Sequence, residues 1–108
     1  KSFDKYAPLG PALVSAAVLG AADKQNLETI VNGEVRQKGN TSDLCFGVRD
    51  LIAWCSQGQT LQKGSLIMTG TPGGVGLFMS PPTFLKNGDV VEVEICGIGR
   101  LRNTIEFV

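Results

Sequence analysis

The sequence contains no histidine among its 108 residues. Histidine is the usual base of Ser-His-Asp and Cys-His nucleophile systems, so this chain alone supplies neither system, nor a histidine general base. There are only three cysteines, and they show no CxxC spacing: Cys45, Cys55 and Cys96. Without histidine or paired cysteines, a zinc site is not expected. We interpret the cysteines as reduced, mostly buried small hydrophobic side chains of an intracellular protein.

A net charge is also lacking, because ten basic and ten acidic residues cancel and neither sign forms a long run. A nucleic-acid-binding surface normally shows a basic face, so no nucleic-acid partner is expected. The apolar stretch near the start is too short to span a bilayer and is interrupted by Asp4, Pro8 and Pro11, which also argues against a signal peptide. We therefore expect no membrane partner. The hydrophobic fraction of 43% is typical of a globular domain with a packed core.

The clearest local pattern is a β-hairpin. Residues 27–31 and 34–37 favour strands, and Asn32-Gly33 between them supplies the two positive φ angles of a type I′ turn. Residues 12–18, before the hairpin, fit either a strand or a short helix.

One substantial helix is predicted at about residues 48–57. Four apolar residues fall on one face at helical spacing: Val48, Leu51, Ile52 and Cys55. Gly58 stands where a C-terminal cap is expected. A strand is predicted next, at residues 65–69.

Two further strands are predicted near the C-terminal end. In residues 90–95 the side chains of Val91, Val93 and Ile95 share a face. After a tight turn at residues 97–99, the last strand places Leu101, Ile105 and Phe107 on one face. Several strands with one substantial helix and no βαβ rhythm indicate an α+β domain dominated by sheet.

Several polar residues are interpreted as structural. Residues 40–43 (NTSD) are expected to cap or orient the helix that follows. Asp89 is assigned to a turn, and Glu92 and Glu94 to the outward face of a strand. Two carboxylates at this spacing can also ligate a metal, but a solvated strand face is the commoner arrangement.

The stretch TGTPGGVG, residues 69–76, is here called the glycine loop. A phosphate-binding loop requires a lysine and a following helix, and the dinucleotide fingerprint also requires the helix; this stretch has neither. Two alternatives remain. The loop is either a structural corner, or a ligand loop whose glycines let the backbone approach a small molecule.

Four phrases resemble the C-terminal part of the fumarylacetoacetate hydrolase family when they are read in order. They are KSFDKYAPLGP, VNGEVRQKGNTSDLCF, LIAWCSQGQTLQKGSLIMTGTPGGVG and FLKNGDVVEVEICGIGRLRN. The resemblance covers nearly the whole chain and is closer to the acylpyruvase-like branch than to fumarylacetoacetase itself. It implies a sheet-rich α+β fold with a layered, rolled, mixed sheet around the active site.

The resemblance also implies roles for three residues. Lys1 matches the family lysine that lies beside a divalent cation and the substrate, where an ammonium group could stabilise an enolate. Gly70 and Thr71 match the pair that contacts a substrate carboxylate or carbonyl oxygen, and Lys1 is expected to face them across the site. Thr69 and Pro72 are assigned to shaping the turn.

The same resemblance places the ligands of a Mg²⁺ or Mn²⁺ ion, and a His–Glu acid/base pair, upstream of this chain. None of these residues is expected within residues 1–108, so no metal ligand is assigned here. Residues 1–108 are therefore interpreted as the C-terminal part of a single catalytic domain, and this part alone is expected to be inactive.

The implied parent enzyme cleaves a carbon–carbon bond next to a carbonyl in small 2-oxo or diketo acids. Acylpyruvate hydrolysis, oxaloacetate decarboxylation and related isomerisations are the reactions considered. A homodimer in the cytoplasm or mitochondrion is expected. The alternative is a non-catalytic binding or assembly module with the same fold.

Overall fold

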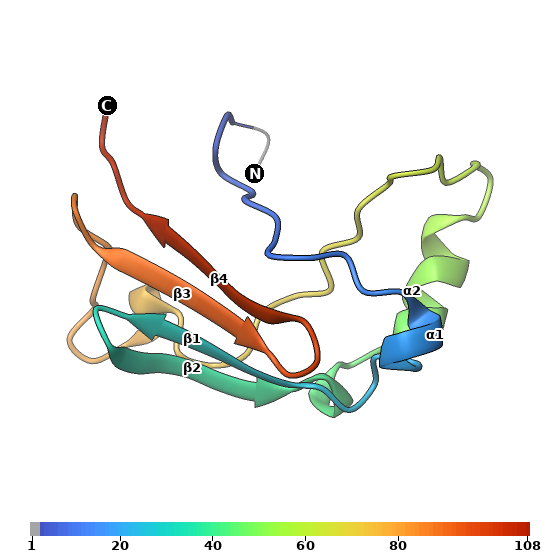
Figure 1. The fold of residues 1–108 in the computed structure, drawn as a ribbon, viewed down its shortest axis with the longest axis horizontal. Coiled ribbons are helices and arrows are strands. Elements are labelled where there is room, and N and C mark those ends of the chain that lie inside the picture. The colour runs from blue at the N-terminus through green and yellow to red at the C-terminus, as the bar shows by residue number, and fades with distance from the viewer. Residues whose placement is uncertain (1–2) are drawn as a thin grey trace.

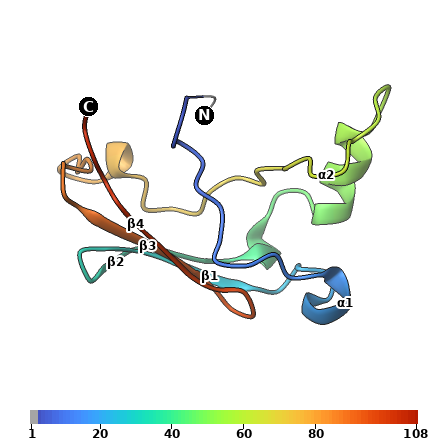
Figure 2. The same cartoon turned by 45° about the horizontal axis from the view of Figure 1, so that its top comes forward.

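The computed structural model describes residues 3–108. Four strands form one sheet, and two α-helices lie beyond one end of it (Figures 1 and 2). The α-helices and strands are α1 Ala16–Leu19, β1 Asn26–Val31, β2 Glu34–Asn40, α2 Val48–Cys55, β3 Val90–Ile95 and β4 Gly99–Thr104. Two 3₁₀ turns complete the described elements, η1 Thr41–Asp43 and η2 Gly76–Phe78.

The sheet has the strand order β2-β1-β3-β4, and neighbouring strands are antiparallel throughout. Two hairpins, β1–β2 and β3–β4, therefore meet along β1 and β3. The long connection between the hairpins carries α2 and the glycine loop. The predicted sheet-rich α+β class is confirmed. The resemblance implied a mixed sheet, whereas every pairing within residues 3–108 is antiparallel.

The turn of the first hairpin also holds the second hairpin. Asn32 and Gly33 have φ angles of 52° and 85°, as the predicted type I′ turn requires. The Asn32 side chain donates from Nδ2 to Asp89 Oδ1 at 2.9 Å and accepts the Val90 N–H at 2.9 Å. Asp89 Oδ2 also accepts the Lys86 N–H at 2.7 Å, which confirms its place in a turn.

A β-bulge interrupts the pairing of β1 with β2. Ile30 pairs with Val35 and Thr29 pairs with Gln37, so Arg36 is an extra residue on β2. A bulge of this kind bends the strand and changes the direction of nearby side chains. It occurs where the glycine loop approaches the sheet.

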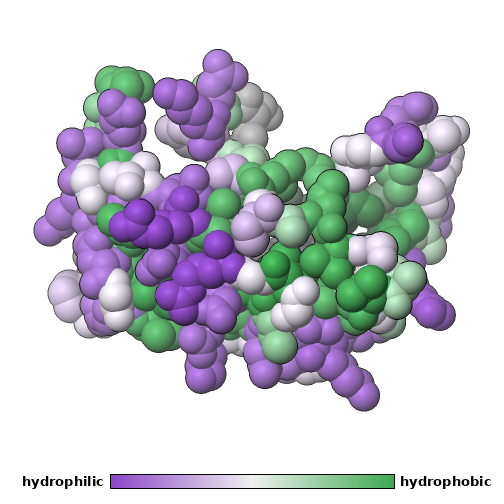
Figure 3. Space-filling view, viewed as in Figure 1, coloured by the Kyte–Doolittle hydropathy of each residue, from purple (hydrophilic) through white to green (hydrophobic). Residues whose placement is uncertain are grey.

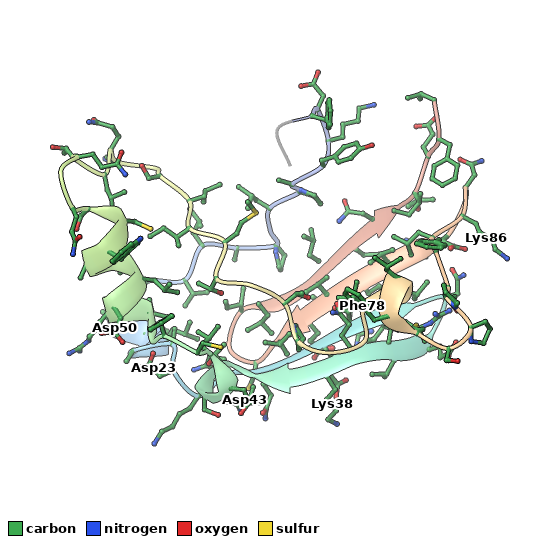
Figure 4. The ribbon with its side chains drawn as sticks, turned by 180° about the vertical axis from the view of Figure 1, so that it is seen from behind. Asp23, Lys38, Asp43, Asp50, Phe78 and Lys86 are labelled. Carbon is green, nitrogen blue, oxygen red and sulfur yellow. The ribbon has the colours of Figure 1, made fainter. Side chains whose placement is uncertain are left out.

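The two faces of the sheet differ in chemistry. The inner face is the one that residues 67–85 of the long connection approach. It carries Leu27, Thr29, Val31, Val91, Val93, Ile95 and Leu101. On the outer face Arg100 pairs with both Glu92 and Glu94, and Lys38 pairs with Glu28 at 2.9 Å. Glu92 and Glu94 thus lie on the outward face, as predicted. Figure 4 shows Lys38 pointing away from the segment that carries Phe78.

Helix α2 begins at the predicted residue and ends two residues earlier than predicted, at Cys55. Asp50 caps it by accepting the Gly47 N–H at 3.2 Å. Of the two predicted roles of residues 40–43, capping or orienting this helix, the capping role is wrong. Asn40 accepts the Ser42 N–H and caps η1 instead. It does not cap α2, since residues 44–47 separate η1 from that helix.

Two strand predictions need correction. Residues 65–69 are not a strand: residues 67–69 face the inner side of the sheet, so the apolar run is partly covered without pairing at an edge. The last strand ends at Thr104 because its partner strand begins at Val90, its register partner. Residues 12–18 form no strand, and the last three of them belong to the short helix α1, Ala16–Leu19.

Within residues 3–108 the buried apolar core consists of Ile30 and Val31. Large apolar side chains elsewhere are exposed, among them Trp54 at 74% and Phe78 at 83%. Figure 3 shows apolar surface gathered between the sheet and the helices. The expectation of a packed core is therefore wrong for this segment by itself.

The interpretation of the cysteines as mostly buried is also wrong, although all three are free thiols. Cys45 and Cys96 are exposed and Cys55 is half-buried. Cys45 lies in the segment between η1 and α2, and Cys96 in the β3–β4 turn, where little of the chain covers them.

Candidate functional site

The glycine loop lies directly against β2. A Cβ atom placed on Gly74 would be 2.1 Å from the Arg36 carbonyl oxygen, a distance that no side chain tolerates. Gly74 also has a φ of 98°, which L-residues with a side chain rarely adopt. The loop therefore docks on the bulge of β2 through backbone contact that only glycine permits.

A second contact comes from the side chain of Gln37. Its Nε2 donates to Thr71 Oγ1 at 2.8 Å and to the Pro72 carbonyl oxygen at 3.0 Å. Gln37 is half-buried and Thr71 is exposed. One side chain on β2 therefore holds two consecutive residues of the loop.

The far end of the loop is fixed by Gly76. Its carbonyl oxygen accepts the Thr83 N–H at 2.9 Å, and a Cβ there would lie 2.0 Å from the Thr83 carbonyl oxygen. Within the same region the Arg36 Nη1 donates to Met79 Sδ at 3.6 Å. The loop is thus anchored at Thr71 and Pro72, at Gly74 and at Gly76.

A groove of about 1170 Å³ lies between residues 67–85 and the inner face of the sheet. Most of its lining is apolar, from residues such as Val31, Ile67 and Leu77. Arg36 and Gln37 are the polar side chains that β2 contributes. An apolar groove with a few polar groups is the usual form of a small-molecule site.

Arg36 brings positive charge to the groove. Its side chain is 22% exposed, and Nε lies 3.4 Å from a carboxylate oxygen of Glu34. That distance is within ion-pair range, but the geometry is not that of a hydrogen bond, and Nε is buried without a hydrogen-bond partner among the described residues. The charge is therefore only partly compensated.

The structure places two of the three predicted site residues together. Gly70 and Thr71 both line the groove, and a Cβ on Gly70 would meet no atom within 4 Å, so the space beside its backbone is open. Lys1 lies outside the described residues. That Lys1 faces Gly70 and Thr71 across the site stays a prediction.

The groups with shifted pKa values lie away from the groove. A hydrogen bond from Asn32, and then one from the Lys86 N–H, lower the pKa of Asp89 from its ordinary 3.8. Glu28 raises the pKa of Lys38, and Glu94 raises the pKa of Arg100. Lys38 and Arg100 lie on the outer face of the sheet and Asp89 lies in the turn before β3, so these pKa shifts reflect structural pairing.

The part of the chain that the structure describes contains no group of three or more His, Cys, Asp or Glu side chains able to hold a metal ion. The alternative that Glu92 and Glu94 form such a site does not fit, because both carboxylates are paired with Arg100. Within residues 3–108 no helix has the length and apolar character needed to cross a membrane.

A search against family models matches residues 1–106 to the fumarylacetoacetate hydrolase C-terminal family. The chain belongs to this family. The curated relatives include the human mitochondrial oxaloacetate tautomerase FAHD2A, which is 50% identical over 107 residues, 97% of this chain and 33% of the relative. The oxaloacetate tautomerase YisK of Bacillus subtilis is 45% identical over 105 residues, 97% of this chain and 35% of the relative.

Solved structures of the family superpose on this fold. A fumarylacetoacetate hydrolase of Exiguobacterium antarcticum has a TM-score of 0.94 at 42% identity and covers 100% of this chain and 39% of its own. A maleylpyruvate hydrolase of Sphingobium sp. SYK-6, solved with manganese(II) and pyruvate, has a TM-score of 0.78 at 33% identity, covering 90% and 34%. This chain therefore spans about a third of the length of such relatives. Tautomerase and hydrolase relatives are consistent with the acylpyruvase-like branch.

Sequence reasoning did not identify Arg36 and Gln37 as groove residues. Both stand in the phrase VNGEVRQKGN, where alternation alone gives no sign of the bulge. The available signal was their position shortly after the Asn-Gly turn, inside one of the four phrases that resemble the family.

Proposed function

We propose that this family member forms the substrate-binding part of a divalent-metal-dependent enzyme for small 2-oxo or diketo acids. The supporting observation is Thr71, whose hydroxyl lies at an apolar groove and whose oxygen is held by Gln37. The reaction passes through an enolate, which is common to breaking a carbon–carbon bond beside a carbonyl and to keto–enol isomerisation. Relatives named as hydrolases and tautomerases support both outcomes.

The described residues would stabilise the substrate oxygen that gains negative charge as the enolate forms. The Thr71 hydroxyl and the Gly70 N–H donate to that oxygen and add no charge of their own. The apolar lining of the groove strengthens such hydrogen bonds by excluding water. The Lys1 ammonium group, as the resemblance implies, would add positive charge on the opposite side.

The metal requires residues beyond those described, because no cluster in residues 3–108 fits an ion. We propose that Mg²⁺ or Mn²⁺ is held by another part of a longer polypeptide, and the manganese complex of the maleylpyruvate hydrolase supports this. When bound, such an ion supplies Lewis acidity at the oxygens of the 2-oxo acid.

We further propose that residues 1–108 are the C-terminal part of one catalytic domain and are inactive alone. Relatives about three times as long, and exposed apolar side chains such as Trp54 and Phe78, support this. The rest of the polypeptide and a second subunit would cover that surface. The mitochondrial names of several relatives support an intracellular location.

The test uses the full-length polypeptide that contains this segment. Keto–enol interconversion and decarboxylation of oxaloacetate, and cleavage of an acylpyruvate, are measured with Mg²⁺ and with a chelator. Activity should disappear with the chelator, and Thr71→Val should lower kcat/KM by about 10²–10³-fold, the usual cost of one oxyanion donor.

Thr60→Val is the matched control, since Thr60 is an exposed threonine of the connector outside the groove and should behave like the wild type. Activity that survives the chelator, or an undiminished rate in Thr71→Val, would contradict the proposal. No turnover of any of these substrates would instead favour the non-catalytic binding module.

A further inference from the structure

The hydrogen bonds from Gln37 to the glycine loop determine where the hydroxyl proton of Thr71 can point. It is the residue that follows the bulge on β2, and its amide reaches the loop through Nε2. A primary amide nitrogen has two hydrogens, and here each has an acceptor: Thr71 Oγ1 at 2.8 Å and the Pro72 carbonyl oxygen at 3.0 Å.

The Pro72 contact determines which amide atom faces the loop. A carbonyl oxygen only accepts hydrogen bonds, so the amide atom next to it must be the nitrogen. The same nitrogen contacts Thr71 Oγ1, and the hydroxyl oxygen is therefore the acceptor of that bond. The single hydroxyl proton of Thr71 must point in another direction.

That proton has no acceptor within the described residues, while Thr71 is exposed and lines the groove. A hydroxyl that already accepts a hydrogen bond is also a stronger donor, because hydrogen bonds in a chain polarise one another. The arrangement leaves Thr71 as a strengthened donor facing the groove.

We propose that Gln37 is a positioning residue that commits the Thr71 hydroxyl to donate to the substrate oxygen. The inference rests on the proposed function, in which Thr71 contacts the substrate. A simpler role is that Gln37 only anchors the loop through Pro72. The two roles differ in one respect: the first needs the Thr71 hydroxyl, and the second does not.

A double-mutant cycle separates the roles in the full-length polypeptide, with oxaloacetate as substrate and saturating Mg²⁺. Gln37→Met keeps the length of the side chain and removes both hydrogen bonds, and we expect about a tenfold lower kcat/KM. In a Thr71→Val background the same change should have no further effect. In a Thr71→Ser background, which keeps the hydroxyl, the tenfold loss should persist.

An equal loss in the Thr71→Val background would overturn the positioning role and leave Gln37 as a loop anchor. No loss in Gln37→Met, together with a loss in Thr71→Val, would also overturn it while the proposed function stands. If Thr71→Val is fully active, the proposed function fails, and this inference fails with it. Lys38→Met, one residue along on the outer face, is the control and should keep wild-type kinetics.

Gln37→Glu gives a second readout when it is compared with and without Thr71→Val. The two side chains have the same size, but an ionised carboxylate accepts the Thr71 proton and turns it away from the substrate. We expect a larger loss than in Gln37→Met at neutral pH, with recovery of kcat/KM as the pH falls and the introduced carboxyl is protonated.

An ionised carboxylate also loses the hydrogen bond to the Pro72 carbonyl oxygen, so only the part of the pH effect that needs the Thr71 hydroxyl reports on positioning, and that part should vanish in the Thr71→Val background. A pH profile parallel to the wild type would contradict the inference. Melting temperatures of all variants identify any that fail to fold.

Discussion

The sheet and the glycine loop are adjacent, but they are held by different kinds of interaction. The sheet is held by backbone hydrogen bonds that repeat along three antiparallel strand pairs, so each bond is supported by its neighbours. The loop depends on a few unlike contacts: the amide of Gln37, the backbone approach of Gly74 and the bond at Gly76. A single substitution should therefore affect the loop much more than the sheet.

The largest effect is expected at Gly74. Gly74→Ala would place a methyl group against the Arg36 carbonyl oxygen at a positive φ, and the loop must leave the bulge or strain it. In the full-length polypeptide we expect a loss of about 3 kcal/mol in the free energy of unfolding, or a detached loop with little activity. Denaturant unfolding and kcat/KM measure the two outcomes.

Gly73→Ala is the matched control for this comparison. A Cβ on Gly73 would meet no atom within 4 Å, and its φ is not in the left-handed range. Stability should change by less than about 0.5 kcal/mol. If Gly74→Ala and Gly73→Ala lost the same stability and activity, the contact with β2 would not determine the conformation of the loop.

A smaller effect is expected at Asn32, which joins the hairpins. Asn32→Ala removes two side-chain hydrogen bonds and places alanine at a φ of 52°, so unfolding should become easier by about 2 kcal/mol. Asn32→Gly keeps the turn and loses only the hydrogen bonds, and should cost about half as much. Equal losses would mean that the turn angle contributes nothing.

The smallest effect is expected at Asp89, which is only half-buried. Its pKa in the folded protein lies below 3.8, so the folded state favours the ionised carboxylate. The stabilisation is complete above 3.8 and disappears as the pH falls through the lowered value. The melting temperature of Asp89→Asn should therefore be lower than that of the wild type at neutral pH, and the difference should shrink in acid. A difference independent of pH would contradict this assignment.

Local patterns predicted the sheet well because its signals lie close together in the sequence. Asn32-Gly33 specifies its own turn, and alternation in β3 assigns Val91 and Val93 to one face without reference to other strands. The family resemblance then indicated Gly70 and Thr71, which the structure places in the groove. Their relation to Lys1 remains a prediction.

What could not be predicted depends on contacts between distant residues. Gln37 and Thr71 are separated by 34 positions, and nothing near either residue indicates their hydrogen bond. Residues 65–69 have a strand-like composition, yet pairing depends on a free sheet edge and not on composition. The exposure of Cys45 and Cys96 likewise depends on which parts of the fold cover them.

The bulge on β2 has a consequence for how this segment can vary in length. Removing Arg36 would join Val35 directly to Gln37. Each residue of β1 would keep its present partner on β2, and each side chain would stay on the same face of the sheet. The hairpin therefore does not need this residue, and a one-codon deletion would keep its pattern intact. The groove does need it, because the deletion removes both the carbonyl oxygen that Gly74 approaches and the groove's partly compensated guanidinium. The hairpin pairing and the groove can thus be altered independently at this position.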